Sequence, residues 1–220
     1  MGRSVLTTTG LLLDFSGTLI DDFKPTWLSV CDILRYFDKP PITLIEFQSL
    51  FCLPFWKIFV DCGIEDIPKS YFVKLYTDFI QKYADNVSLF GEVRKFLTRH
   101  IGSNRKIGIV SQTPSEQIDY YLDKFRLGEF FSTIVSLEDC VEQKPAPLPL
   151  LVAAEKMSVD PSQSIYVGDM AEDIIAAKYA RMTPIAVYRQ FGSYNTRVKL
   201  LSAKPHAIIS SLEELFNIAN

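Results

Sequence analysis

Leu11-Leu12-Leu13-Asp14-Phe15-Ser16-Gly17-Thr18-Leu19 is an apolar run that ends on a carboxylate and continues into a Gly-Thr turn. A short apolar run bounded by a turn signal is typical of a buried β-strand, which places Asp14 at the carboxyl end of that strand. A carboxylate held there, close to the backbone N–H groups of a glycine turn, can serve as a nucleophile or a metal ligand in phosphoryl transfer. Asp14 is therefore the first candidate functional residue of the chain.

The composition is typical of a globular protein that acts on small molecules. With 220 residues, 48% hydrophobic and 22% charged, the chain can bury a sizeable core and fits one domain with an insertion or two small domains. The net charge is -3 and no basic stripe is evident, so we expect no nucleic-acid partner and no membrane partner. The apolar runs are of strand length, well below the roughly 20 residues of a membrane span. Four cysteines lie singly, which fits reduced thiols, and we expect a cytoplasmic protein.

Residues 20–88 differ in character from the rest of the chain. Aromatic side chains recur there at intervals of three to four residues, as in Phe47, Phe51 and Phe55, and β-branched runs are rare. This spacing predicts amphipathic helices. We therefore expect a helical cap domain over residues 20–88, with most of its aromatic side chains in a small core of its own and a minority lining a substrate cavity or a dimer contact. No sequence feature indicates the oligomeric state.

The remainder of the chain alternates between strand and helix patterns. Alternation of this kind implies right-handed βαβ units, and hence an α/β fold with a doubly wound parallel sheet and helices on both faces. We expect this core domain to comprise residues 1–19 and 89–220. Ligands bind at the carboxyl ends of the strands in such sheets. The predicted strands are 106–110, 134–136, 164–167 and 184–187, and the predicted helices are 92–100, 115–125, 148–157, 172–180 and 211–218.

Two further predicted strands end on polar side chains. Ser111-Gln112-Thr113 follows the strand 106–110 and offers hydroxyl groups and turn amides suited to a phosphate oxygen. Asp169 follows the strand 164–167, and Asp173 comes four residues later, near the start of the next helix. Carboxylate oxygens are the ligands that Mg²⁺ prefers, so this pair predicts a magnesium site.

Lys144, in Lys144-Pro145-Ala146-Pro147, precedes another predicted helix. Its ammonium group can offset the charge of a phosphoryl group and of Asp14. Taken singly, these residues have simpler interpretations: Ser111 as a helix cap, Lys144 as a solvated loop charge, and Asp173 as an acid at a helix N-terminus. Their order, each at a strand end or helix start, favours a site for phosphoryl transfer.

These motifs resemble those of the haloacid dehalogenase (HAD) superfamily, in the phosphoglycolate phosphatase-like group whose helical cap is inserted just after the first motif. The resemblance covers nearly the whole chain and implies a Rossmann-like core and a Mg²⁺-dependent phosphatase of a small phosphorylated metabolite. It implies Asp14 as the nucleophile, with Mg²⁺ held by the Asp14 carboxylate, the Ser16 carbonyl and Asp169. Asp173 would act at the metal through hydrogen bonds or water. The implied substrate-binding residues are Thr18, Ser111, Gln112 and Lys144.

Ser16 is the main departure from the pattern of this superfamily, whose phosphatases usually carry a second Asp there. That Asp protonates the leaving alkoxide and then activates water, and such general acid–base groups contribute about 10² to 10⁴ in rate. A serine hydroxyl does this poorly, which predicts a slow phosphatase, a substrate with a good leaving group, or a different reaction. Arg181 is a lesser departure, since a glycine often ends that helix.

Two alternatives follow from Ser16. The phosphonoacetaldehyde hydrolases of the same superfamily lack the second Asp and use a cap lysine as a Schiff base, and Lys57 is the cap lysine that could play this part. The other alternative is a protein that binds a phosphorylated ligand and metal but turns over negligibly.

Overall fold

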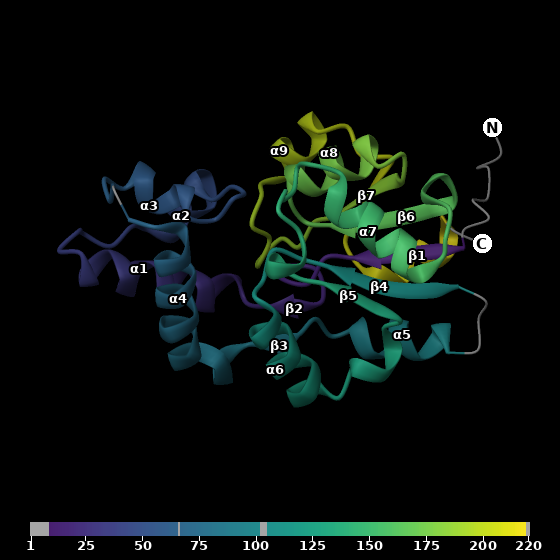
Figure 1. The fold of residues 1–220 in the computed structure, drawn as a ribbon, viewed down its shortest axis with the longest axis horizontal. Helices are drawn as coiled ribbons and strands as arrows, with labels where there is room; N and C mark the ends of the chain where they lie inside the picture. Colours follow the sequence, from purple (N-terminus) through teal and green to yellow (C-terminus); the bar gives the residue numbers. More distant parts are fainter. Residues whose placement is uncertain (1–8, 66, 102–104, 219–220) are drawn as a thin grey trace.

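The computed structural model describes residues 9–65, 67–101 and 105–218. Its core is a six-stranded parallel sheet in the order β5-β4-β1-β6-β7-β8, with helices on both faces (Figure 1). The predicted α/β fold with a parallel sheet is confirmed. In chain order the strands are β1 (Gly10–Leu13), β4 (Lys106–Val110), β5 (Thr133–Val135), β6 (Ser164–Gly168), β7 (Thr183–Val187) and β8 (Ala207–Ile209). The helices of this part are α5 (Val93–His100), α6 (Ser115–Phe125), α7 (Leu148–Met157), α8 (Ala171–Tyr179) and α9 (Arg197–Ser202).

β1 lies in the middle of the sheet, which explains its uninterrupted apolar sequence. It pairs in parallel with β4 and β6, and Leu13 is in register with Ile109 and Val167. Successive residues of a strand point to opposite faces, so Leu11 and Leu13 join one apolar cluster and Leu12 joins the cluster on the other face. A parallel strand covered by helices on both faces requires apolar residues throughout.

The helical segment lies beside the sheet, beyond the ends of its strands (Figure 1). Its helices are α1 (Phe23–Tyr36), α2 (Leu44–Leu50), α3 (Lys57–Asp61) and α4 (Lys69–Ile80). A short antiparallel ribbon of β2 (Ile20–Asp21) and β3 (Ser88–Leu89) connects the segment to the core at both of its ends. The aromatic side chains of the segment form their own cluster, which Met170 and Tyr194 of the core join. We propose that the β2–β3 ribbon is the boundary between the core and cap domains; residues 1–8, 66, 102–104 and 219–220 of those domains lie outside the described residues.

Near the C-terminus the structure differs from the predicted elements. The segment 211–218, predicted as a helix, forms a 3₁₀-helix (Leu212–Asn217) that begins with a capping box between Ser211 and Glu214. β8 and α9 were not predicted, because three and six residues are too few for a clear periodic pattern. Within the described ranges, no helix combines the length and apolar character needed to cross a membrane.

Candidate active site

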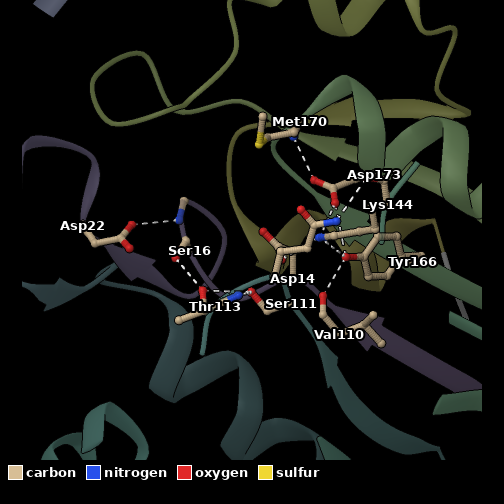
Figure 2. A network of polar contacts seen from close by, with 12 residues as sticks. Asp14, Ser16, Asp22, Val110, Ser111, Thr113, Lys144, Tyr166, Met170 and Asp173 are labelled. Atoms are coloured by element: carbon tan, nitrogen blue, oxygen red, sulfur yellow. Dashed lines mark hydrogen bonds and ion pairs between the residues drawn. The ribbon is translucent and has the colours of Figure 1, made fainter. Parts of the chain in front are cut away.

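The carboxyl ends of β1, β4 and β6 meet at one edge of the sheet and bring the predicted residues together (Figure 2). Asp14 follows β1, Ser111 follows β4, and Asp169 follows β6. Backbone bonds continue the ladder past the strands, with the N–H of Asp14 donating to Val167 O at 2.8 Å. The sheet itself therefore positions these side chains, and the loops that follow the strands supply the rest of the site.

Gly17 allows the loop after β1 to fold against Asp169. Its φ of +70° lies in the left-handed region that favours glycine. A Cβ atom at this position would lie 2.5 Å from Asp169 Oδ2, closer than packing permits. No other residue type fits this turn without displacing Asp169, so the glycine of the Gly-Thr turn is a requirement of the site.

Lys144 lies at the centre of a buried polar network (Figure 2). Its Nζ donates to Asp14 Oδ1 at 2.9 Å, to Asp173 Oδ1 at 2.6 Å and to the Tyr166 hydroxyl at 2.9 Å. Burial opposes the ammonium form, but Asp14 and Asp173 together raise the pKa of Lys144 above its usual value. Burial raises the pKa of Asp14 to about 6, against the lowering effect of Lys144. The three protons of the ammonium are thus committed to the protein, and Lys144 balances the charge of Asp14.

The carboxylates of Asp14, Asp169 and Asp173 form a cluster suited to a cation. One oxygen of each lies within 4.8 Å of the others, and all three residues are buried. Asp169 Oδ2 accepts from the N–H of Tyr194 at 2.8 Å, whereas Oδ1 has no hydrogen-bond partner among the described residues. Burial, followed by repulsion from Asp14 and Asp173, raises the pKa of Asp169 well above its usual value. A hard divalent cation would satisfy the unpaired oxygen and offset the repulsion, so these residues fit Mg²⁺.

Asp173 differs from the other two acids because protein donors occupy both of its oxygens. Oδ1 accepts from Lys144 and Tyr166, and Oδ2 accepts from the N–H of Met170 at 2.9 Å. Gly168 leaves the space for this carboxylate, since a Cβ atom there would overlap it. Asp173 is therefore placed to hold Lys144 beside Asp14, and it suits an indirect role at the metal.

Ser16 lines the cavity above Asp14, and its hydroxyl lies 3.2 Å from Thr113 Oγ1. Thr113 also accepts from the Ser111 hydroxyl at 3.1 Å, so three hydroxyl groups form a chain across the loops after β1 and β4. Ser111, Gln112 and Thr113 all line the cavity. These loops therefore offer uncharged donors on the side of Asp14 opposite Lys144 (Figure 2).

Asp22 is a buried acid next to Ser16 that sequence reasoning missed. Its Oδ1 accepts from the N–H of Gly17 at 3.2 Å, while Oδ2 makes no hydrogen bond of normal geometry within the described chain. Burial raises the pKa of Asp22 to about 7, although the nearby hydroxyls of Ser16 and Tyr194 lower it. The adjacent acids Asp21-Asp22, so soon after the Gly-Thr turn, were the sequence signal that could have identified it.

Three other candidates, Thr18, Gln112 and Lys57, differ in their position relative to the cavity. Thr18 is buried but does not line the cavity, and its Oγ1 has no hydrogen-bond partner in the part of the chain described. Gln112 lines the cavity, and its Nε2 donates to the carbonyl of Lys144 at 3.1 Å, which supports the lysine loop. Lys57 is exposed at the start of α3 and is not among the cavity residues. Thr18 and Lys57 thus receive no support from the structure as functional residues.

The cavity has a volume of about 60 Å³ and lies between the strand ends and the helical segment. Its floor contains the polar residues described above. The remaining wall comes from the helical segment and from two core loops. The residues of this wall are Thr26, Val30, Phe51, Leu53, Phe55, Tyr76, Pro114, Met170 and Tyr194.

Solved structures share this fold at low sequence identity. A protein from Lactobacillus plantarum matches with a TM-score of 0.86 and 20% identity, covering 96% of this chain and 99% of that one. A haloacid dehalogenase-like family hydrolase from Streptococcus pneumoniae matches with a TM-score of 0.80 and 17% identity, covering 96% of this chain and 97% of that one.

Curated relatives match over part of their length. Phosphoglycolate phosphatase from Salmonella typhi is 29% identical over 156 residues, which is 69% of this chain and 61% of the relative. The enzyme of the same name from Escherichia coli K12 is 28% identical over the same shares. The chain thus spans about three fifths of the length of these relatives. The family model for haloacid dehalogenase-like hydrolases matches residues 11–187, and the chain therefore belongs to that family.

Proposed function

We propose that this protein is a Mg²⁺-dependent phosphatase that hydrolyses a small phosphorylated metabolite through an aspartyl-phosphate on Asp14. The observation that carries the proposal is the Asp14 carboxylate, which lines the cavity beside Lys144 and lies in the same acidic cluster as Asp169. The phosphoglycolate phosphatases among the relatives support phosphate-ester chemistry at such a site. With a pKa of about 6, Asp14 is ionised and nucleophilic at neutral pH.

In the first step, a carboxylate oxygen of Asp14 attacks phosphorus, and the bond from phosphorus to the ester oxygen breaks. In the second step, water attacks the phosphorus of the aspartyl-phosphate, which releases phosphate and restores Asp14. Ser111 and Thr113 supply hydroxyl donors to the phosphoryl oxygens, and Lys144 offsets the charge next to Asp14. Asp14, Asp169 and the carbonyl of Ser16 would hold Mg²⁺, which supplies further neutralisation of phosphoryl charge.

The leaving alkoxide needs a proton, and Ser16 is a weak source of one. The proposal therefore includes slow turnover of esters with basic leaving groups and faster turnover of esters whose leaving group departs as a stable anion. Ser16 also motivates the competing proposal of a phosphate-binding protein with negligible turnover. Its hydroxyl lies near the Asp22 carboxyl but is itself hydrogen-bonded to Thr113, and neither contact replaces an acid facing the substrate.

The test is phosphate release from p-nitrophenyl phosphate with and without Mg²⁺, using Asp14→Asn as the inactive variant. Asp119→Asn, which changes an exposed carboxylate on α6, is the matched control. We expect Mg²⁺-dependent turnover that Asp14→Asn abolishes and Asp119→Asn leaves intact. Correctly folded protein that releases no more phosphate than Asp14→Asn, but binds phosphate, would establish the binding protein instead.

A further inference from the structure

The wall of the cavity around the leaving group is almost entirely uncharged. The residues above the catalytic floor are apolar or aromatic, apart from three hydroxyl groups on Thr26, Tyr76 and Tyr194. Among the described residues that line the cavity, none is arginine or histidine, and Lys144 is the single lysine. The three donors of Lys144 are committed to Asp14, Asp173 and Tyr166. The wall thus offers no free cation to a leaving group.

Lys199 and Arg189, which flank the loop that carries Tyr194, are also committed to other partners. Lys199 Nζ donates to the carbonyl of Phe51 at 3.4 Å and lies 4.0 Å from Glu172. Arg189 forms an ion pair with Glu92 at 2.6 Å. Neither cation lines the cavity. A second anionic group on the substrate would therefore be buried without a counter-charge, which proteins strongly disfavour.

The three hydroxyl groups form one connected cluster. Tyr194 OH donates to Thr26 Oγ1 at 2.7 Å, and Thr26 Oγ1 lies 3.3 Å from Tyr76 OH. Burial raises the pKa of both tyrosines above the usual value, so they remain neutral. The cluster can bind one neutral oxygen of a ligand but cannot compensate a charge. The rest of the wall, including Val30, Phe51 and Phe55, offers only apolar contact.

We propose that the substrate is a phosphate monoester whose leaving group is uncharged and mainly apolar, with at most one neutral oxygen facing the Thr26–Tyr76–Tyr194 hydroxyls. This inference rests on the proposed phosphatase function and sharpens it. The proposed substrate differs from phosphoglycolate, the compound that gives the curated relatives their name, because phosphoglycolate carries a carboxylate next to the ester. The same wall disfavours polyol phosphates, whose additional hydroxyl groups would lose water without gaining partners.

Two matched pairs of esters test the inference with the 220-residue chain in Mg²⁺. Hydroxyacetone phosphate and phosphoglycolate have the same shape, but the first has a methyl ketone where the second has a carboxylate. We expect kcat/KM to be at least about 100-fold higher for hydroxyacetone phosphate, because an unpaired charge is more costly than an unpaired hydroxyl. Propyl phosphate and glycerol 3-phosphate share a carbon chain, and we expect propyl phosphate to be preferred about 10-fold.

A variant that supplies the missing cation gives the reciprocal test. Leu53 lines the cavity and is half-buried, so Leu53→Arg can place a guanidinium in the wall without filling the core. We expect Leu53→Arg to shift the kcat/KM ratio at least about 10-fold toward phosphoglycolate, whereas the control Leu53→Met leaves the ratio unchanged. Equal shifts in both variants would contradict a role for charge.

The inference and the proposed function fail in different ways. Turnover that depends on Asp14 but is equal or faster with phosphoglycolate overturns the inference and leaves the phosphatase standing. If no ester is hydrolysed, the phosphatase fails, and calorimetric binding of hydroxyacetone phosphate and phosphoglycolate to the same protein decides the ligand class. Tighter binding of hydroxyacetone phosphate supports the uncharged class, and equal or tighter binding of phosphoglycolate rejects it.

Discussion

At the scale of single residues, Ser16 and Asp22 are the unusual features of this site. Ser16 lies on the cavity floor with a hydroxyl that is hydrogen-bonded to Thr113. Asp22 lies behind it and is fully buried. One of its carboxylate oxygens accepts a hydrogen bond from the N–H of Gly17, and the other makes no hydrogen bond of normal geometry in the described chain. A carboxyl group is thus close to the loop but outside the cavity lining, and the two residues can be tested separately.

Ser16→Asp places a titratable carboxyl group on the cavity floor. We expect kcat for alkyl phosphates to rise about 10² to 10³-fold, because the new acid protonates the alkoxide and then activates water. The gain for p-nitrophenyl phosphate should be smaller, since that leaving group departs without a proton. Steady-state kinetics on both esters measure the difference. Ser16→Asn has the same shape without the acid, and an equal gain in that variant would contradict the explanation.

Asp22→Asn should change how stability depends on pH. The pKa of Asp22 is about 7 in the folded protein and about 3.9 in an unfolded chain, so folding favours its protonated form. The stability that this group contributes is therefore fully present below about pH 4 and is lost as the pH rises from there through 7. We expect the free energy of unfolding of Asp22→Asn, relative to wild type, to increase by about 2 to 3 kcal/mol between pH 5 and pH 8.

Urea denaturation in the presence of a chelator measures this difference at each pH. Asp119→Asn, at an exposed position, is the control and should show no such trend. A constant difference between Asp22→Asn and wild type across the pH range would show that Asp22 is not protonated in the folded protein.

At the scale of elements, the end of α8 shows how this chain departs from the usual pattern. Arg181 follows the helix with a φ of +60°, in the left-handed region. The N–H of Met182 donates to Ala177 O at 2.8 Å, and the N–H of Arg181 donates to Lys178 O at 3.0 Å. This is the Schellman arrangement that glycine usually completes. The helix therefore keeps its normal ending, at the cost of a strained arginine.

Arg181→Gly should stabilise the protein. The left-handed conformation costs a residue with a Cβ atom about 1 to 2 kcal/mol, while glycine loses about 0.5 to 1 kcal/mol of extra entropy on folding. We expect a net gain of about 0.5 to 1 kcal/mol in the free energy of unfolding, measured by urea denaturation. Arg181→Ala removes the charge but keeps the Cβ atom, and a gain of the same size in that variant would attribute the effect to charge.

At the scale of the whole molecule, Tyr194 connects the acidic cluster to the helical segment. Its backbone N–H donates to Asp169, and its ring contacts Phe23, Phe47 and Phe51. Gln48 adds a hydrogen bond from its Nε2 to the carbonyl of Ser193 at 2.9 Å. The loop before α9 therefore shapes both the acidic floor and the apolar wall of the cavity.

Mg²⁺ should stabilise the folded protein, because the buried acids repel one another without it. A ligand that binds only the folded state at 100 times its Kd contributes about 2.7 kcal/mol. For a chain of this size that corresponds to a rise in Tm of about 5 to 10 °C. Thermal unfolding in EDTA and in Mg²⁺ measures the shift. Asp169→Asn should lose it, and an undiminished shift in that variant would place the ion elsewhere.

The local sequence determined the architecture and the identity of the candidate catalytic groups. Apolar runs and helical periods predicted the sheet strands β1, β4, β5, β6 and β7 and the helices α5 to α8, because these patterns record which faces must be buried. The predicted parallel topology indicated that the polar residues at the strand ends form the ligand site. The short elements β8 and α9 were missed because their patterns contain too few residues.

Only the tertiary structure decided which atoms meet. Lys144 reaches Asp14 across 130 residues of sequence, and Tyr194 reaches Thr26 across 168. Local sequence patterns likewise did not predict the roles of Tyr166 and Asp22 or the uncharged cavity wall. Periodicity specifies the face on which a side chain lies, whereas a hydrogen bond or a buried charge depends on how separate elements pack. For this reason the sequence determined the class of chemistry, and the fold decided the network around Lys144 and the shape and polarity of the space for the substrate.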